Sequence, residues 1–170
     1  MPTTAQYGLI VNAQETLASN VPAVASTNNN VPHTGYSTTT KTLTATGSAT
    51  QPPLTKVAYF SKALSSGTGT IDLTALPGTN GATADATGLK VCLLVFRNPP
   101  TNANKITITK GATNGFGVTS ADDPLTVTLS PGAEIAFFGN EVTPDVASGK
   151  KTIDLTGTGS QALECVVWAG

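Results

Sequence analysis

The residues of this 170-residue chain that could do chemistry are few and stand apart from one another. The single histidine, His33, lies in NNNVPHTGY, where the sequence offers no third group on a rigid element to hold it, as a catalytic triad requires. Cys92 and Cys165 are flanked by apolar residues, whereas a nucleophilic cysteine needs a partly exposed, electropositive setting. We therefore expect no catalytic residues, and two buried reduced thiols with a cross-strand disulfide as the alternative.

Carboxylates in two loops are the candidates for a metal site. Asp85 in GATADATG and the pair Asp122 and Asp123 in TSADDP lie where oxygen ligands could converge on calcium. Neither loop follows an ordered ligand spacing, so we expect a solvated loop at Asp85 and an Asx-type turn before Pro124. The sequence thus predicts no bound metal and no other cofactor.

The charge balance excludes several classes of partner. Only 11% of the residues are charged, against about 25% in an ordinary soluble domain. With 9 basic and 10 acidic residues the chain has no cationic field for a phosphate backbone, so we do not expect nucleic-acid binding. No apolar run approaches the length of a membrane span, and MPTTAQYGLIVNAQ lacks the features of a secretory signal, so we expect synthesis in the cytoplasm and no membrane partner.

The character of the sequence changes near residue 50. Residues 1–50 mix Pro, Asn, Thr and Gly without a sustained period, which predicts an extended N-terminal arm that serves assembly. A short helical turn around Ala13 to Ala18 is an alternative within it. Residues 51–170 contain short β-branched runs separated by turn residues, which predicts one β-sandwich domain.

The regular spacing of these runs predicts an all-β chain, an antiparallel β-sandwich of jelly-roll-like type. Alternation in KITITK and LTVTL places Ile106, Ile108, Leu125, Val127 and Leu129 on buried faces. The segment LTVTLSPGAEIAFF predicts a tight hairpin. We expect strands at Lys41 to Thr46, Leu54 to Phe60, Thr70 to Leu76, Leu89 to Phe96, Lys105 to Lys110, Leu125 to Leu129, Glu134 to Phe138, Thr152 to Thr156 and Ala162 to Trp168.

The pentapeptide TIDLT occurs twice, at residues 70–74 and 152–156. Only fourteen residues follow the second copy, so a duplication of the whole domain is excluded. We expect two strands in similar half-buried settings, both at a sheet edge, where an outward Asp72 or Asp154 discourages unwanted strand pairing.

Exposed aromatic side chains are the candidates for ligand binding, because carbohydrate sites usually stack sugars on them. Tyr7, Tyr36 and Phe116 are the candidates, with Tyr59 as a further one. The remaining aromatic residues in apolar runs are expected in the core, namely Phe60, Phe96, Phe137 and Trp168.

Three stretches, IDLTALPGTNGATADATGLKVCLLVF, LSPGAEIAFFGNEVTPDV and IDLTGTGSQALECVVWAG, resemble small Thr- and Gly-rich β-sandwich proteins of bacteriophage virions. The resemblance covers about residues 69 to 170 and brings no catalytic residues with it. It implies a head decoration or cement protein, or another capsid-associated subunit, whose partners are a major capsid protein and further copies of itself. By analogy with this family we expect a trimer.

The expected function is therefore a non-enzymatic structural role in a virion, with many weak contacts acting together. Two other functions remain open. One is a carbohydrate-binding or adhesion module, and the other is a subunit that polymerises by itself into a tube or fibre.

Overall fold

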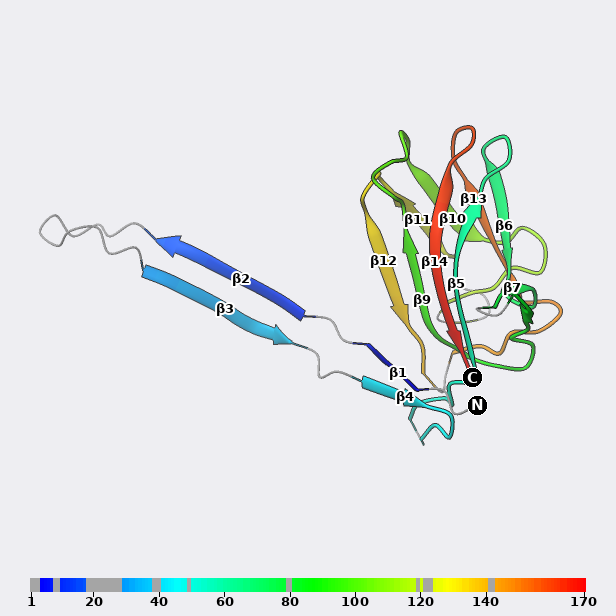
Figure 1. Ribbon diagram of the computed structural model, residues 1–170, viewed down its shortest axis with the longest axis horizontal. Coiled ribbons are helices and arrows are strands. Elements are labelled where there is room, and N and C mark those ends of the chain that lie inside the picture. The colour runs from blue at the N-terminus through cyan, green and yellow to red at the C-terminus, as the bar shows by residue number, and fades with distance from the viewer. Residues whose placement is uncertain are drawn as a thin grey trace, which may run out of the picture. The chain divides into compact units, whose positions relative to one another are not determined.

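The computed structural model describes residues 4–7, 10–17, 29–37, 41–48, 50–78, 81–118, 120, 124–140 and 143–170. These residues form strands, turns and loops without any helix, so the prediction of an all-β chain is confirmed (Figure 1). The chain divides into two compact units. One comprises Met1–Thr4 with Leu43–Gly170, and the other comprises Ala5–Thr42.

The smaller unit is built from paired strands. Strand β2 (Ile10–Leu17) pairs antiparallel with β3 (Asn29–Ser37), and β1 (Thr4–Tyr7) pairs with β4 (Lys41–Thr44), both of which run across the boundary of the unit. The alternative of a helical turn around residues 13–18 is wrong where the structure describes it, because residues 13–17 belong to β2. Backbone pairing with β3 gives this stretch a partner that its composition did not reveal.

The larger unit contains two four-stranded antiparallel sheets. Sheet A has the order β12-β9-β14-β5, and sheet B has the order β11-β10-β13-β6. A short two-stranded sheet of β7 and β8 accompanies them. The strands are β5 (Lys56–Ala63), β6 (Thr68–Asp72), β7 (Leu76–Pro77), β8 (Thr83–Ala84), β9 (Val91–Arg97), β10 (Ile106–Lys110), β11 (Thr126–Leu129), β12 (Glu134–Phe138), β13 (Thr152–Thr156) and β14 (Ala162–Ala169).

The strand pairs of the two sheets are nested. Strand β5 pairs with β14, β6 with β13, β9 with β12 and β10 with β11. The first of these eight strands thus pairs with the last, the second with the seventh, the third with the sixth and the fourth with the fifth. The β9–β14 and β10–β13 ladders join these pairs into the two sheets. Contacts between residues far apart in sequence therefore hold both sheets together.

One hydrophobic core lies between the sheets, an arrangement consistent with a β-sandwich. Its members alternate along each strand with outward residues, as a half-buried strand requires. Each large side chain buried there stabilises the fold by about 1.5–3 kcal/mol. Sheet A contributes Ala58, Leu94, Phe96, Leu163, Cys165 and Val167, and sheet B contributes Ile71, Ile106, Ile108, Leu129, Ile153 and Leu155.

The segment LTVTLSPGAEIAFF does not form the hairpin that its turn residues predict. Strand β11 pairs with β10 in sheet B, whereas β12 pairs with β9 in sheet A. The turn around Gly132, which has a positive φ of 82°, therefore carries the chain from one sheet to the other. Leu129 and Ile135 then meet the same core from opposite sides. Packing of the two sheets, rather than local turn chemistry, decides the pairing.

The two TIDLT copies lie next to each other in sheet B. Strand β13 pairs antiparallel with β6, so that Ile153 lies opposite Ile71 and Asp154 lies opposite Thr70. The expectation of two edge strands holds for β6 but is wrong for β13, which lies between β10 and β6. The repeat thus marks two neighbouring strands whose isoleucines enter the same core.

Both cysteines are buried and unbonded, as the reduced-thiol prediction expects. Cys165 lies in the core, where burial raises the pKa of its thiol to about 12. Cys92 lies 1% exposed, with Sγ 3.8 Å from the Pro53 carbonyl oxygen. The raised pKa keeps the Cys165 thiol neutral at ordinary pH, and the thiolate is the reactive form.

Candidate interaction surface

The outer face of sheet A is built from three rows of side chains that cross the four strands. Because Leu94, Phe96, Val167 and Ala58 point into the core, the residues between them point away from it. The strand register aligns these outward residues into rows. The Trp168 row is Phe138, Leu93, Trp168 and Val57, the Tyr59 row is Ala136, Val95, Val166 and Tyr59, and the Arg97 row is Glu134, Arg97, Glu164 and Ser61.

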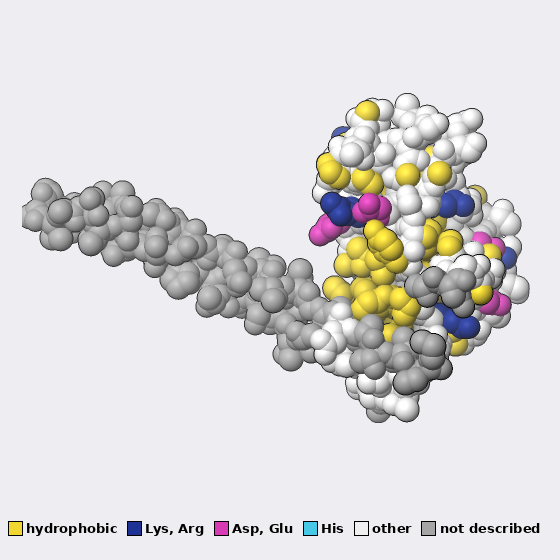
Figure 2. Space-filling view, viewed as in Figure 1, with side chains coloured by type: hydrophobic (Ala, Val, Ile, Leu, Met, Phe, Trp, Pro, Cys, Tyr) yellow, Lys and Arg dark blue, Asp and Glu magenta, His cyan; other side chains and the backbone are white. Residues whose placement is uncertain are grey.

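Two of these rows are entirely apolar, and together they form what we call the apolar outer face. Tyr59 is 66% exposed and Phe138 is 46% exposed, the two large hydrophobic side chains most open to solvent among the described residues. Trp168, Val95 and Val166 are half-buried. Figure 2 shows hydrophobic side chains gathered over the strands of sheet A. Contiguous apolar surface of this kind marks interaction sites in soluble proteins.

Charged residues border the apolar outer face on one side. Nη1 of Arg97 lies 3.4 Å from Oε2 of Glu164, with the two side chains 50% and 31% exposed. Glu134 lies opposite Arg97 in the neighbouring strand pair. In Figure 2 basic and acidic side chains adjoin the hydrophobic ones. An apolar centre with a polar rim is the usual anatomy of a protein–protein interface.

The prediction missed most of this surface. Trp168 was expected in the core but lies on the outer face, since its neighbours Val167 and Ala169 point inward. Phe138 was not a candidate, and Tyr59 was a secondary one. A usable signal is present in the sequence, because CLLVF and CVVW are continuously apolar, and a strand that is apolar on every residue is apolar on both faces.

The carboxylate candidates do not assemble a metal site where the structure describes them. Asp85 is exposed, and its Oδ1 accepts hydrogen bonds from the Thr87 hydroxyl at 2.6 Å and the Thr87 backbone N–H at 2.8 Å. These bonds lower the pKa of the Asp85 carboxyl and close a local turn. Asp122 and Asp123 lie outside the described residues. Within the described ranges, no three His, Cys, Asp or Glu side chains gather as metal ligands.

The three aromatic candidates are not brought together as a described site. Phe116 is 0% exposed and belongs to the core, so it has no free ring face for a sugar and the prediction for it is corrected. Tyr7 lies in β1 and Tyr36 in β3, and their side chains lie outside the described ones. His33 also lies in β3.

The carboxylates of the TIDLT repeat make hydrogen bonds on the outer side of sheet B. Oδ1 and Oδ2 of Asp154 accept from the Thr70 hydroxyl and the Ala112 backbone N–H, both at 2.8 Å. Oδ2 of Asp72 accepts from Lys151 Nζ at 2.8 Å, and its Oδ1 accepts from Thr74. Burial raises the pKa of Asp72, but these bonds outweigh it and the pKa is lowered overall. These groups stabilise loops and strands rather than forming a reactive pair.

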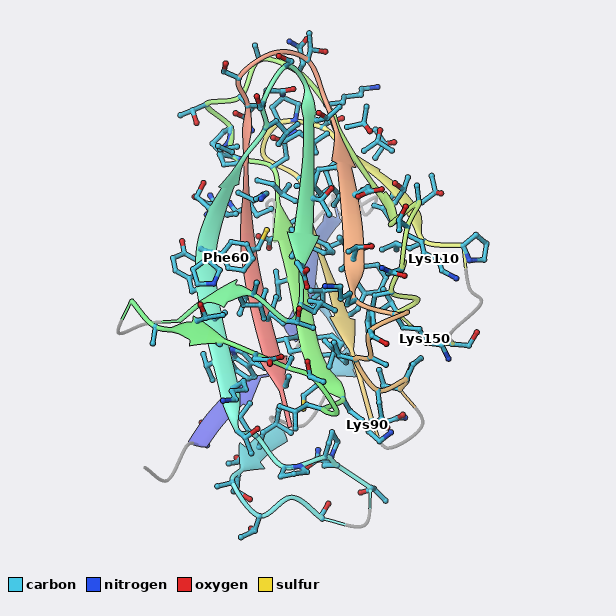
Figure 3. All side chains as sticks on the ribbon, turned by 90° about the vertical axis from the view of Figure 1, so that its right-hand side faces the viewer. Phe60, Lys90, Lys110 and Lys150 are labelled. Atoms are coloured by element: carbon cyan, nitrogen blue, oxygen red, sulfur yellow. The ribbon has the colours of Figure 1, made fainter. Side chains whose placement is uncertain are left out.

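A shallow hollow of about 110 Å³ lies between β5 and β6. Phe60 and Lys62 line it from β5, and Ile71 and Asp72 from β6; Figure 3 looks toward these two strands and labels Phe60. Sites for small molecules usually measure about 300–1,000 Å³. The hollow is therefore too small for a ligand of that class.

A buried amide cluster near the end of β9 is structural. Asn98 is 0% exposed, and its Nδ2 donates to the carbonyl oxygens of Asn104 and Leu129 at 3.1 and 2.9 Å. Its Oδ1 accepts from Asn102 Nδ2 at 2.6 Å. The amide hydrogens and the oxygen of this buried side chain all have partners within the protein, so the cluster stabilises the surrounding loops.

Comparisons of the chain with protein-family models, with curated proteins and with solved structures found no match. Across the described residues, the structure has no helix long and apolar enough to cross a membrane. The apolar outer face of sheet A is thus the feature of the described surface that most needs a functional explanation.

Proposed function

We propose that the chain is a non-enzymatic structural protein of a bacteriophage virion, either a capsid decoration or cement protein or another capsid-associated subunit. The apolar outer face carries the proposal, because it offers a contact surface with a charged rim on a chain with only 11% charged residues. The Thr- and Gly-rich stretches that resemble virion proteins support the same role.

The nested strand order supports a jelly roll as the finer fold. A hairpin of four strands out and four strands back, rolled into two sheets, pairs its first strand with its last, as β5 pairs with β14 here. Jelly rolls occur in viral capsid domains and in lectins. The fold thus agrees with the proposed role, but it also agrees with carbohydrate binding.

In this proposal residues 1–50 serve as an N-terminal arm that ties the domain to a shell or a neighbouring subunit. The pairing of β2 with β3 supports this role, because an isolated two-stranded ribbon is only marginally stable in water. Burial against a capsid protein would offset the entropy of ordering the arm. Several weak contacts made at once then give a lasting attachment.

The test is made on particles of the phage that encodes the chain. We expect the chain to co-purify with density-purified particles in a fixed ratio to the major capsid protein, by quantitative mass spectrometry. Particles assembled without it should release their genome at a lower temperature, and added purified chain should restore the wild-type value. Absence of the chain from purified particles would contradict the proposal.

A carbohydrate-binding or adhesion module is the second candidate, and the exposed ring of Tyr59 favours it. Aromatic rings with an open face offer apolar contact area to a ligand. Glycan-array binding that is lost with Tyr59→Ala would support this function. If the chain still binds particles but gives no signal on the glycan array, carbohydrate binding is excluded.

A further inference from the structure

We infer that the apolar outer face of sheet A is a homodimer interface, in which a second copy of the chain packs face to face about a two-fold axis parallel to the strands. The axis lies between β9 and β14, the two central strands of sheet A. This inference goes beyond the proposed function and does not depend on it, because self-association of the purified chain needs no shell.

Rotation about this two-fold axis reverses the order of the strands across the sheet but leaves each residue at the same position along the strand direction. Strand β12 of one copy then lies over β5 of the other, and β9 lies over β14. Each of the three rows meets the same row of the second copy. An interface of this kind is self-complementary, since every contact occurs twice.

The side chains of the apolar rows complement one another in size. In the Trp168 row, Phe138 lies over the partner's Val57, and Leu93, which is only 5% exposed in the free chain, lies beneath the partner's Trp168. In the Tyr59 row, the small Ala136 receives the partner's Tyr59. Two packed sheets lie about 10 Å apart with interdigitated side chains, which favours large residues opposite smaller ones.

The charged row gives the interface its orientation. Arg97 of each copy lies over the partner's Glu164, so two pairs of opposite charges form across the interface. Glu134 lies over the partner's Ser61, so no two like charges meet directly. Complementary charges of this kind fix the register of an interface.

A two-fold axis perpendicular to the strands fits the face less well. When it matches the two apolar rows with each other, the Arg97 rows of the two copies no longer face each other, so the Arg97–Glu164 pairs across the interface are lost. When it is centred on the Tyr59 row, Trp168 and Glu164 come to lie over each other, and an apolar contact then buries a carboxylate. The parallel axis is therefore the arrangement that satisfies both the apolar rows and the charged row.

The area of the face sets the strength of the dimer. Four strands about 4.8 Å apart and three rows about 6.8 Å apart cover roughly 400 Å² on each copy. A stable interface usually buries about 800 Å² on each partner. We therefore expect a weak dimer that dissociates on dilution, and that becomes effective where many copies gather.

Sedimentation equilibrium of the full chain over a wide range of concentration tests the inference. The wild-type chain should show a reversible monomer–dimer equilibrium. Arg97→Glu and Glu164→Arg should each weaken the dimer at least about tenfold, because like charges then face each other across the interface. A one-to-one mixture of the two variants should recover dimers, because each new charge meets an opposite one on the other chain.

Lys150→Glu is the matched control for Arg97→Glu, because it reverses an exposed charge in the turn before β13. It should leave the dimer unchanged, and thermal unfolding should show that every variant is folded. A strictly monomeric wild-type chain, a mass of three copies, or a mixture that stays monomeric would each overturn the inference. The particle experiment would still decide the proposed function separately.

Discussion

The two sheets of the larger unit are alike on their inner faces and opposite on their outer faces. Both point aliphatic and aromatic side chains into one core. The outer face of sheet A carries two apolar rows, whereas the outer face of sheet B carries threonines. Two rows of the outer face of sheet B are Thr128, Thr107, Thr156 and Thr68, and then Thr126, Thr109, Asp154 and Thr70.

The two outer faces differ in whether their own side chains satisfy them. On sheet B the hydroxyls of Thr107 and Thr128 lie 2.9 Å apart and hydrogen-bond to each other, and Thr70 donates to Asp154. Such a face is satisfied by its own bonds and by water. The apolar outer face of sheet A gains free energy only when another apolar surface covers it. The two outer faces therefore differ in chemistry although both sheets cover the same core.

The largest expected effect comes from the shared core. Phe96→Ala in sheet A and Ile108→Ala in sheet B each remove a fully buried side chain, so both should lower the free energy of unfolding by about 2–5 kcal/mol. Urea denaturation monitored by circular dichroism measures this loss. If only one variant is destabilised, the two sheets do not pack on one shared core.

Cys165 points into the core from β14, the strand whose outward residues Val166 and Trp168 belong to the apolar outer face. Burial raises its pKa from 9.0 to about 12, so the folded state favours the neutral thiol. Stability is then fully present below about pH 9 and falls by about 1.4 kcal/mol for each pH unit above it. The wild-type chain should lose about 2 kcal/mol more than Cys165→Ala between pH 9 and 10.5. Equal losses would mean that the thiol is accessible.

Asp72 tests whether the polar groups on the outer face of sheet B are satisfied by bonds to one another. Its pKa is lowered overall, so the folded state favours the carboxylate, and this stabilisation is present above about pH 4 and is lost as the pH falls through the lowered value. Because the side chain is 34% exposed, the contribution should be below about 1 kcal/mol. Urea midpoints at neutral and acid pH should show a smaller acid loss for Asp72→Asn. If the acid loss is unchanged in this variant, the ion pair between Asp72 and Lys151 does not stabilise the folded state.

Much of the sandwich could be predicted from the sequence, because period-2 alternation and turn residues are local signals. Strands β12 and β13 have the expected bounds, and Ile106 and Ile108 are buried as predicted. The partners of the strands are not local. The segment after Leu125 predicts a hairpin, but its two strands belong to different sheets, because β11 pairs with β10 at the edge of sheet B and β12 pairs with β9 at the edge of sheet A.

The site was harder to predict than the fold for a physical reason. Alternation shows which residues face the core only when the other face is polar, as in KITITK. In CVVW both faces are apolar, so Trp168 could not be distinguished from a core residue. The alignment of Trp168 with Leu93 and Phe138 appears only once the register of three strands is known.

The smallest expected effect on stability separates the two outer faces. Tyr59→Ser on sheet A and Thr126→Ser on sheet B both change exposed residues, so each should alter the free energy of unfolding by no more than about 0.5 kcal/mol. Their effects on association should differ, because only Tyr59 adds to the apolar outer face. Tyr59→Ser should lower the binding of a hydrophobic dye and shift the chain toward the monomer, and Thr126→Ser should change neither. Equal behaviour of the two variants would show that the outer faces do not differ in their need for a partner, since the test changes the surface while leaving the shared core intact.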